Sequence, residues 1–386
     1  MTKFIIKPKS TNSLQNSKLI GSVVPVSLPT SIRSGVWDLF RDGLTQGLLG
    51  AFSTCPEKVR LGYVEGLSER RSSSAMEFGN IIHDTLDLVY SAFLNPEKAP
   101  GYAFIFKEGL EKDWDIAIER IHKILKYKEA EDRKLLSDLK FKAVDGEISI
   151  EENYGKAAAL LPAYVRRWKS DFDRKLTDWK VLEGQFDFKD GQKGQINQGS
   201  NYDPFDDRIR VRGKWDGVFR SPTGKLWLLE TKTKGRINEA DIMDMLNIDL
   251  QVGLYLYAIW MVYGEVPGGV YYNVIRTPQL RQKKTETLAE FIKRVDKDLA
   301  DRPEHYFYRY QASITQKDLE AFRENFKPQV DRLVEWVRGA SHYRNTKACT
   351  LGGISCRFLP ICSRGDRSRF VTRTEPFAEL TDDLVE

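Results

Sequence analysis

Acidic and basic side chains flank a short turn in the middle of the chain, at spacings that suit metal-assisted chemistry. The turn is Ser221-Pro-Thr-Gly224, in which Pro presets an early turn position and Gly accepts a positive φ. In a hairpin symmetric about Thr223, Asp216 and Glu230 each lie seven residues from the pivot and face each other, with Cβ atoms about 5 Å apart. Lys232 follows Glu230 by two residues and shares its face of the strand. Two carboxylates and one ammonium group therefore converge on one patch.

The two facing carboxylates need a counter-charge. Like charges directly opposite each other destabilise a sheet, and a hard divalent cation with oxygen ligands neutralises them. Such a cation polarises a phosphoryl oxygen and lowers the pKa of bound water, while a neighbouring lysine orients that water. The hairpin therefore predicts a Mg²⁺-type site. The alternative is a surface hairpin with an ion pair, in which Glu230 pairs with Lys232 or Asp216 with Lys214.

Two helical motifs lie on either side of this hairpin in the sequence. Gly79 and His83 are four residues apart and share one helix face, so a neutral imidazole would project toward the sheet edge. Gln251 and Tyr255 likewise share a face and offer an amide and a phenol to a ligand. Taken singly, the first motif also fits a core histidine and the second fits ordinary helix packing.

The chain contains four cysteines, Cys55, Cys349, Cys356 and Cys362. They are too few for a disulfide scaffold in a chain of 386 residues. Six and five residues separate the last three, whereas zinc ribbons usually pair cysteines two residues apart. The spacing therefore argues against a simple zinc module.

Charge is informative where it is read locally. The whole chain has 60 Lys and Arg against 55 Asp and Glu, a net charge of +5. Residues 327–374 hold ten basic and three acidic residues, and the last twelve residues hold five acidic residues and no base. A basic block that contains three of the four cysteines predicts a site near a polyanion backbone. The alternative is a solvated helix face followed by an acidic tail.

Composition and hydropathy set the class of protein. With 41% hydrophobic, 30% charged and 11% aromatic residues, the sequence is typical of a globular protein and excludes a disordered or fibrous one. No apolar run approaches the roughly 20 residues needed to cross a bilayer, and the N-terminal apolar stretch is too short for a signal peptide. We therefore expect an intracellular, cytoplasmic protein without a membrane partner.

Apolar periodicity and β-branched runs predict the elements that must position these residues. Helical spacing predicts helices over 36–61, 73–93, 106–139, 156–179, 239–262 and 316–338. Alternating and β-branched segments predict strands over 181–188, 209–219, 226–232, 269–276 and 306–313. The chain thus begins with helices, continues through a helical insertion and then forms a sheet.

The motifs, in this order, resemble the signature of the PD-(D/E)XK nuclease superfamily. Asp216, followed after thirteen residues by Glu230-Thr-Lys232, is similar to its Asp…(Asp/Glu)-X-Lys pattern. Glu183 resembles the acidic residue on the preceding strand. Gly79-Asn-Ile-Ile-His83 and Gln251-Val-Gly-Leu-Tyr255 are similar to the Gly-X-X-X-His and Gln-X-X-X-Tyr motifs of the RecB-like branch.

This resemblance implies the roles of the site residues. Asp216 and Glu230 would bind Mg²⁺ or Mn²⁺, with His83 as a third ligand and the Thr231 carbonyl as a fourth. Lys232 would position the attacking water. Three further residues would contact substrate or support the site, namely Gln251, Tyr255 and Glu183.

The cysteines add another similarity. One N-terminal cysteine and a C-terminal triplet, Cys55 with Cys349, Cys356 and Cys362, resemble the iron–sulfur staple of CRISPR-associated RecB-like exonucleases and AddB-type nuclease subunits. The resemblance implies a [4Fe–4S] cluster that ties the two ends of the nuclease domain together. A Cys₄ zinc site and four unrelated buried cysteines are the alternatives.

The resemblance also implies the fold and the domain plan. We expect a mixed α/β (α+β) fold with a restriction-endonuclease-like core, in which helices flank a central mixed sheet, plus a helical insertion and an iron–sulfur-stapled C-terminal lobe. An N-terminal arm (1–35) and an acidic tail (376–386) would flank a single nuclease domain (36–375). Its parts would be the early helices (36–93), the insertion (100–180), the catalytic sheet (181–313) and the cysteine-bearing end (316–375).

The implied activity is metal-dependent exonuclease cleavage of DNA, on single strands or DNA ends, in recombination, repair or DNA processing. The alternatives are an endonuclease for branched or specific DNA, and a non-catalytic DNA-binding or recruitment subunit. No Gly-X-X-X-X-Gly-Lys-(Ser/Thr) motif occurs in the sequence, so the chain has no ATP motor motif of its own. We therefore expect it to act on DNA either alone or with a separate helicase or recombination protein as a partner.

Overall fold

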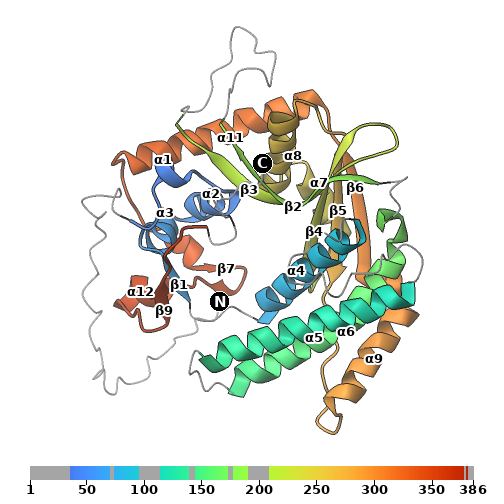
Figure 1. Ribbon diagram of the computed structural model, residues 1–386. Helices are drawn as coiled ribbons and strands as arrows, with labels where there is room; N and C mark the ends of the chain where they lie inside the picture. Colours follow the sequence, from blue (N-terminus) through green and yellow to red (C-terminus); the bar gives the residue numbers. More distant parts are fainter. Residues whose placement is uncertain are drawn as a thin grey trace, which may run out of the picture.

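A five-stranded mixed β-sheet lies at the centre of the protein (Figure 1). In this computed structural model the strand order is β2-β3-β4-β5-β6, with β4 and β5 parallel and the other neighbours antiparallel. The strands are Asp178–Phe188 (β2), Val211–Arg220 (β3), Leu226–Lys234 (β4), Gly269–Arg276 (β5) and Phe307–Ser313 (β6). The predicted mixed α/β fold, with a central mixed sheet flanked by helices, is confirmed.

The structure describes residues 35–69, 74–94, 114–138, 144–172, 177–189, 208–377 and 380. The predicted arm (1–35) and acidic tail (376–386) lie outside this part of the chain except at their inner edges. The loop between β2 and β3 also lies largely outside it.

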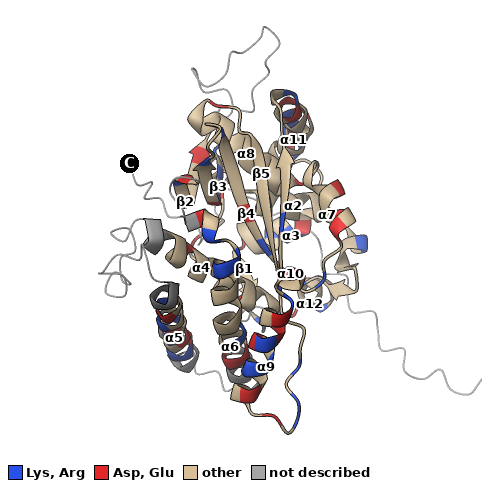
Figure 2. Cartoon of the chain, turned by 90° about the vertical axis from the view of Figure 1, so that its right-hand side faces the viewer, with Lys and Arg blue, Asp and Glu red and all other residues tan. Residues whose placement is uncertain are grey.

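Helices cover both faces of the sheet. One layer packs on β2, β4 and β5 and contains α2 (Gln46–Thr54), α8 (Leu250–Tyr263) and α11 (Gln316–Val337). The other layer contains α4 (Ser74–Leu94), α5 (Trp114–Asp138), α6 (Val144–Arg167) and α9 (Leu288–Asp301). Each layer buries its own apolar core against the sheet, as a sheet with two apolar faces requires. Figure 2 shows the central strands mostly without charge, whereas α9 carries residues of both signs.

Shorter elements complete the chain. They are α1 (Leu39–Asp42), α3 (Pro56–Val59), η2 (Arg60–Val64), η5 (Lys169–Phe172), α7 (Glu239–Leu246) and α10 (Pro303–Tyr306). Near the C-terminus lie η6 (Thr346–Cys349), β7 (Thr350–Leu351), β8 (Ile354–Ser355) and α12 (Leu359–Arg364). Strand β1 (Leu67–Glu69) pairs antiparallel with β9 (Phe370–Thr372).

The pairing of β1 with β9 joins the two ends of the chain in a small lobe with its own core. This core contains Leu61 and Leu67 from the first segment, and Phe358, Ile361 and Phe370 from the second. We call residues 55–69 and 342–373 the cysteine lobe. In Figure 1 it lies to the side of the central sheet, with α12, β1 and β9 close together.

The structure corrects three of the predicted elements. The single helix over 239–262 is wrong, because α7 ends at Leu246 and α8 begins at Leu250, bent by 41°. Asp249 caps α8 by accepting hydrogen bonds from the first turn, which favours a new helix over continuation. The helix over 156–179 is wrong at its end, since β2 already begins at Asp178. The helix over 36–61 is divided into α1, α2 and α3.

One long helix, α9, was not predicted, nor were the short elements of the cysteine lobe, such as β1, β7, β8, α12 and β9. Helix α9 begins after Thr287, whose side chain and that of Glu290 form a capping box. This start signal is readable in the sequence.

No single helix in the described part of the chain is both long and apolar enough to cross a bilayer. The bent pair of α7 and α8 passes by length and composition alone, and α8 packs into the sheet core.

Candidate active site

The β3–β4 hairpin brings Asp216 beside Glu230. The ladder is symmetric about Thr223, as predicted, with pairs from Arg220–Leu226 to Gly217–Leu229. The paired register ends there, one residue before Asp216 and Glu230, so the two carboxylates are not a ladder pair. Here Asp216 Oδ2 accepts a hydrogen bond of 2.7 Å from the Thr231 N–H, so a carboxylate extends the ladder. The hairpin thus fixes one of the two carboxylates by a backbone contact of the other strand.

Helix α4 packs closely on β4 and carries Gly79 and His83. A Cβ at Gly79 would lie 3.1 Å from the Thr233 Oγ1, tighter than ordinary contact, so glycine lets the helix approach the strand. One turn later, His83 Nδ1 lies 3.7 Å from Asp216 Oδ1. Burial lowers the pKa of His83, which favours the neutral imidazole. The predicted motif therefore points at the predicted aspartate.

Glu230 and Lys232 lie on the opposite face of β4, toward α8. The Glu230 side chain is fully buried, and Lys232 Nζ lies 2.6 Å from its Oε1. Lys232 also donates a hydrogen bond of 2.8 Å to Gln251 Oε1. Asp249 accepts from the Gln251 N–H at 2.9 Å and so orients the first turn of α8. The ammonium group is held between a carboxylate and an amide.

Burial dominates the titration of these groups. Burial raises the pKa of Asp216, although the hydrogen bond from the Thr231 N–H lowers it in part. Burial also raises the pKa of Glu230, and the negative charge of Asp216 raises it further. Burial lowers the pKa of Lys232, but Glu230 and Asp216 outweigh it, and the pKa ends above its ordinary value. Two neighbouring carboxylates whose pKa values stay raised beside Lys232 mark a site with less positive charge than its carboxylates need.

Glu230 lacks the partners that a buried charge needs. Neither of its oxygens makes a hydrogen bond of normal geometry among the described residues, although Lys232 forms an ion pair with it. Such a carboxylate is costly to bury, and carboxylate oxygens are the ligands that Mg²⁺ and Mn²⁺ prefer. Asp216 and Glu230 therefore fit a hard divalent cation by their chemistry. Within the described ranges, however, no group of three or more His, Cys, Asp or Glu is arranged to hold one ion. The ligand roles of His83 and Thr231 stay predictions.

The two remaining predicted site residues are placed less directly. Glu183 lies on β2, which pairs with β3. The neighbouring pairs Leu182–Gly217 and Gly184–Trp215 place position 183 next to Asp216 in the register of these two strands. The side chain of Glu183 lies outside the described residues. Tyr255 packs its ring edge-on against Phe186, and its carbonyl accepts a hydrogen bond of 3.1 Å from Trp215 Nε1.

A buried polar network beneath Thr231 was not predicted. Asn273 on β5 is the register partner of Thr231 and donates a hydrogen bond of 2.6 Å to Tyr164 Oη. Next along the sheet, Arg309 binds Asp171 through hydrogen bonds of 2.7 and 2.8 Å. The network ties the helical insertion to the strand that carries the site. Its signal in the sequence is Asn273, a polar residue inside an otherwise apolar strand.

All four cysteines line a second feature, a cavity of about 200 Å³ in the cysteine lobe. They are free thiols from both ends of the chain, Cys55, Cys349, Cys356 and Cys362. The Asn345 N–H donates a hydrogen bond of 3.3 Å to Cys55 Sγ. Their convergence on one cavity is what a shared metal group needs, but the described residues contain no group of three or more metal ligands arranged around one ion. The iron–sulfur cluster therefore stays a prediction.

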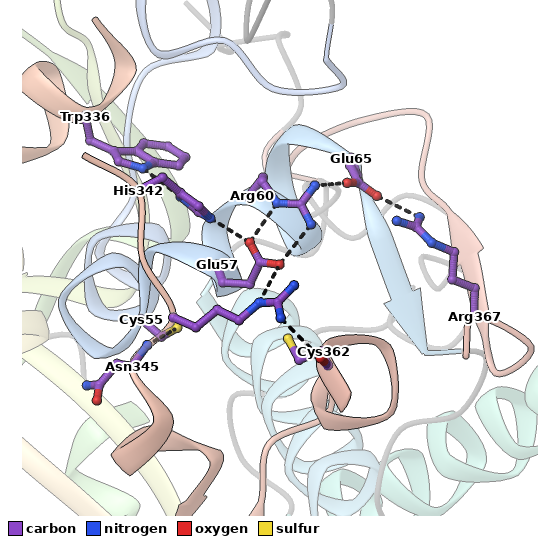
Figure 3. A network of polar contacts seen from close by, with 10 residues as sticks. Cys55, Glu57, Arg60, Glu65, Trp336, His342, Asn345, Cys362 and Arg367 are labelled. Carbon is purple, nitrogen blue, oxygen red and sulfur yellow. Dashed lines mark hydrogen bonds and ion pairs between the residues drawn. The ribbon is translucent and has the colours of Figure 1, made fainter. Parts of the chain in front are cut away.

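A buried carboxylate stands next to this cavity (Figure 3). Glu57 is 2% exposed, and Arg60 donates two hydrogen bonds to it, of 2.7 and 2.9 Å. His342 Nδ1 accepts from Trp336 Nε1 at 3.1 Å, so its Nε2 carries the proton and donates to Glu57 at 2.7 Å. Burial raises the pKa of Glu57, but the hydrogen bonds from Arg60 and His342 hold the pKa at about 2. Sequence reasoning missed this network because its members are far apart in the chain.

Comparison with known proteins gives one match. The family model of the PD-(D/E)XK nuclease superfamily matches residues 44–363. This range contains every site residue discussed above, from Cys55 to Cys362. No curated protein matches the chain at a significant level.

Proposed function

The chain belongs to the PD-(D/E)XK nuclease superfamily, and we propose that within it this protein is a Mg²⁺- or Mn²⁺-dependent DNA exonuclease of the RecB-like branch. The family implies a nuclease, that is, a hydrolase. The narrower assignment is supported by the order of four motifs along the chain, Gly79–His83, Asp216, Glu230–Lys232 and Gln251–Tyr255.

The observation that carries the proposal is the environment of Glu230. Its carboxylate is fully buried beside the charge of Asp216, and its one close partner is Lys232, whose Nζ lies 2.6 Å from Oε1. One ammonium group does not compensate two neighbouring buried carboxylates, since burial still raises the pKa of both. Two carboxylates kept buried with one cation between them are best explained by a further cation that completes the site.

The chain's own residues then divide the work of phosphodiester hydrolysis. Asp216 and Glu230 would hold the cation, which supplies Lewis-acid polarisation of the scissile phosphate and a water of lowered pKa. Lys232, fixed by Glu230 and Gln251, would orient the attacking water and offset charge that develops on the phosphate. The neutral His83 would steady Asp216 from the α4 side.

A nucleic-acid substrate is further supported by the charge of the cysteine lobe. From Arg344 to Arg373 the sequence contains seven Lys and Arg against one acidic residue, Asp366. A basic surface of this kind binds phosphate backbones with strong salt dependence.

The test is cleavage of end-labelled linear DNA and of covalently closed circular DNA by the full chain, with Mg²⁺, Mn²⁺ or EDTA. We expect cleavage of the linear substrate only, with either ion, and none in EDTA. Lys232→Ala should abolish it, whereas Lys225→Ala, an exposed lysine in the same hairpin, should not.

Other outcomes separate the alternatives. Cleavage of closed circles would make the protein an endonuclease. DNA binding without cleavage in any metal would favour a recruitment subunit. Full activity of Lys232→Ala would overturn the site assignment.

The second part of the proposal is a [4Fe–4S] cluster bound by Cys55, Cys349, Cys356 and Cys362, with a structural role. It is supported by the shared cavity and by the free state of all four thiols. Protein purified without oxygen should be brown and contain iron and sulfide, and Cys55→Ser should lose both. A colourless protein with one stoichiometric zinc would instead indicate a Cys₄ zinc site.

A further inference from the structure

A small hairpin projects from the cysteine lobe. Strands β7 and β8 pair Thr350 with Ser355 and Leu351 with Ile354. Gly352 and Gly353 form the turn with φ angles of 59° and 79°. Two consecutive positive φ values give the tight turn type that matches the twist of the strands, and glycine adopts them without strain. The tip is therefore a defined structure.

The tip is apolar and exposed. Leu351 is 68% exposed and Ile354 is 77% exposed. They are direct partners in the ladder, so both side chains lie on the same face and form one apolar edge. An exposed aliphatic pair on a rigid projection is unfavourable in water and indicates a binding surface.

Two cations flank the hairpin. Lys347 precedes it by three residues and Arg357 follows it by two, and both are exposed. Other basic residues of the lobe are engaged, for example Arg367 with Glu65 and Arg369 with Glu69. Lys347 and Arg357 have no acidic partner among the described residues. The hairpin thus carries its free positive charge at its base and its apolar edge at its tip.

The base of the hairpin is fixed to the four-cysteine cavity. Cys349 and Cys356 immediately precede and follow the two strands and line that cavity, and the Cys356 N–H donates to the Cys349 carbonyl at 2.7 Å. Figure 1 draws β7 on the side of the lobe turned toward the central sheet and α4. The anchored base gives the tip a fixed direction.

We propose that the β7–β8 hairpin is a wedge that opens the end of a DNA duplex. Leu351 and Ile354 would enter between the last bases and replace their stacking contacts, while Lys347 and Arg357 would hold the phosphates on either side. The separated strand would then be available to the site at Asp216 and Glu230. The inference rests on the proposed DNA function.

The charge pattern favours DNA over a protein as the occupant. A protein-docking tip would gain little from exposed cations at its base. A duplex end presents stacked bases next to phosphates, which complements an apolar tip that has cations at its base.

The test measures end opening without cleavage. The full chain is added, with Ca²⁺ in place of Mg²⁺, to a blunt duplex that carries 2-aminopurine next to its end. The wild type should raise the fluorescence by about threefold as the base unstacks. The double variant Leu351→Ser/Ile354→Ser should lose most of this rise, and Leu351→Phe should keep or increase it. Val371→Ser removes a 44% exposed aliphatic from the same lobe and should behave as wild type.

A second measurement addresses the cations. In Lys347→Gln/Arg357→Gln, the slope of log binding constant against log salt should decrease by about 2, because two phosphate contacts are lost. Equal end opening by wild type and the serine double variant would overturn the wedge and leave the tip as a protein-docking surface. The fluorescence assay does not depend on cleavage. A protein that opens duplex ends but cleaves no DNA with Mg²⁺ or Mn²⁺ would therefore overturn the nuclease proposal and leave the wedge proposal in place.

Discussion

Two buried glutamates show how differently one residue type is used in this molecule. Glu230 in the sheet is fully buried and has one close partner, the ammonium group of Lys232, while Glu57 in the cysteine lobe is 2% exposed and receives three hydrogen bonds. Their pKa values move in opposite directions. Burial raises that of Glu230, whereas hydrogen bonds from Arg60 and His342 overcome burial at Glu57 and hold its pKa at about 2.

The comparison separates a carboxylate that protein groups compensate fully from one that they compensate in part. Desolvation is the same type of cost in both places, and at Glu57 the hydrogen bonds outweigh it, whereas at Glu230 the single contact with Lys232 does not. The lobe therefore keeps its charge as part of the fold. Under the proposed function, a bound cation would relieve the remaining cost at the sheet site, which is the expected trade between stability and activity.

The largest expected effect comes from replacing the unsatisfied carboxylate. Glu230→Gln removes a cation ligand, and we expect cleavage to fall by about 10⁴-fold, or about 5 kcal/mol. The same change should raise the thermal midpoint in EDTA, because a buried charge is removed. Glu265→Gln, an exposed carboxylate, serves as the control for both measurements. A lower midpoint in Glu230→Gln would mean that the carboxylate is structurally satisfied, and the contrast with Glu57 would be lost.

The second largest effect is expected at Glu57, where a substitution should lower stability although the residue takes no part in the proposed reaction. Glu57→Ala leaves the buried His342 without its acceptor and leaves Arg60 with Glu65 as its remaining carboxylate partner, and we expect a loss of about 3–4 kcal/mol in the free energy of unfolding. Urea unfolding followed by tryptophan fluorescence would measure it. Lys297→Met, which breaks an exposed ion pair with Asp301, should leave the midpoint unchanged.

The two regions also differ in how well sequence predicts them. The pivot at Thr223 follows from turn chemistry, which acts over a few residues. The predicted facing of Asp216 and Glu230 lies one residue beyond the observed ladder and stays a prediction. The lobe joins residues about 300 apart, and no local rule indicates that Glu57 meets His342. Motif resemblance brought the four cysteines together, whereas the polar network beside them has no such pattern.

Within the sheet, prediction failed where tertiary contacts compete with local preference. The apolar run over 239–262 has helical periodicity throughout, and Asp249 nevertheless starts a new helix within it. Asn273 was overlooked because its importance depends on Tyr164, which belongs to the helical insertion. Both residues are polar interruptions of apolar segments, and this is the signal that could have identified them.

The opposite pKa shifts predict opposite responses to pH. The pKa of Glu57 is about 2 in the folded protein and 4.5 in the unfolded chain, so between these pH values the unfolded chain binds more protons. The stability that Glu57 contributes is therefore complete above pH 4.5 and is lost as the pH falls toward 2. That contribution is on the order of 3 kcal/mol. The pKa of Glu230 is higher in the folded protein than in the unfolded chain, so the folded state binds more protons as the pH rises above 4.5. The free energy of unfolding without metal therefore decreases as the pH rises above 4.5.

Unfolding free energies in EDTA between pH 3 and pH 8 would test both signs. Glu57→Gln should flatten the acid limb, and Glu230→Gln should flatten the decline toward neutral pH. If both variants changed the same limb, the two carboxylates would not differ as the structure indicates.

The smallest effect concerns Gln251, the amide that holds Lys232. Gln251→Ala removes the acceptor of the 2.8 Å hydrogen bond from Lys232, so the ammonium group keeps only Glu230 as a partner. One such hydrogen bond is worth about 1 kcal/mol, and we expect kcat to fall by about fivefold with KM unchanged. Gln316→Ala, on the exposed side of α11, is the matched control. A raised KM with unchanged kcat would instead mean that Gln251 contacts the substrate, as its motif implies, and that Glu230 alone suffices to position the lysine.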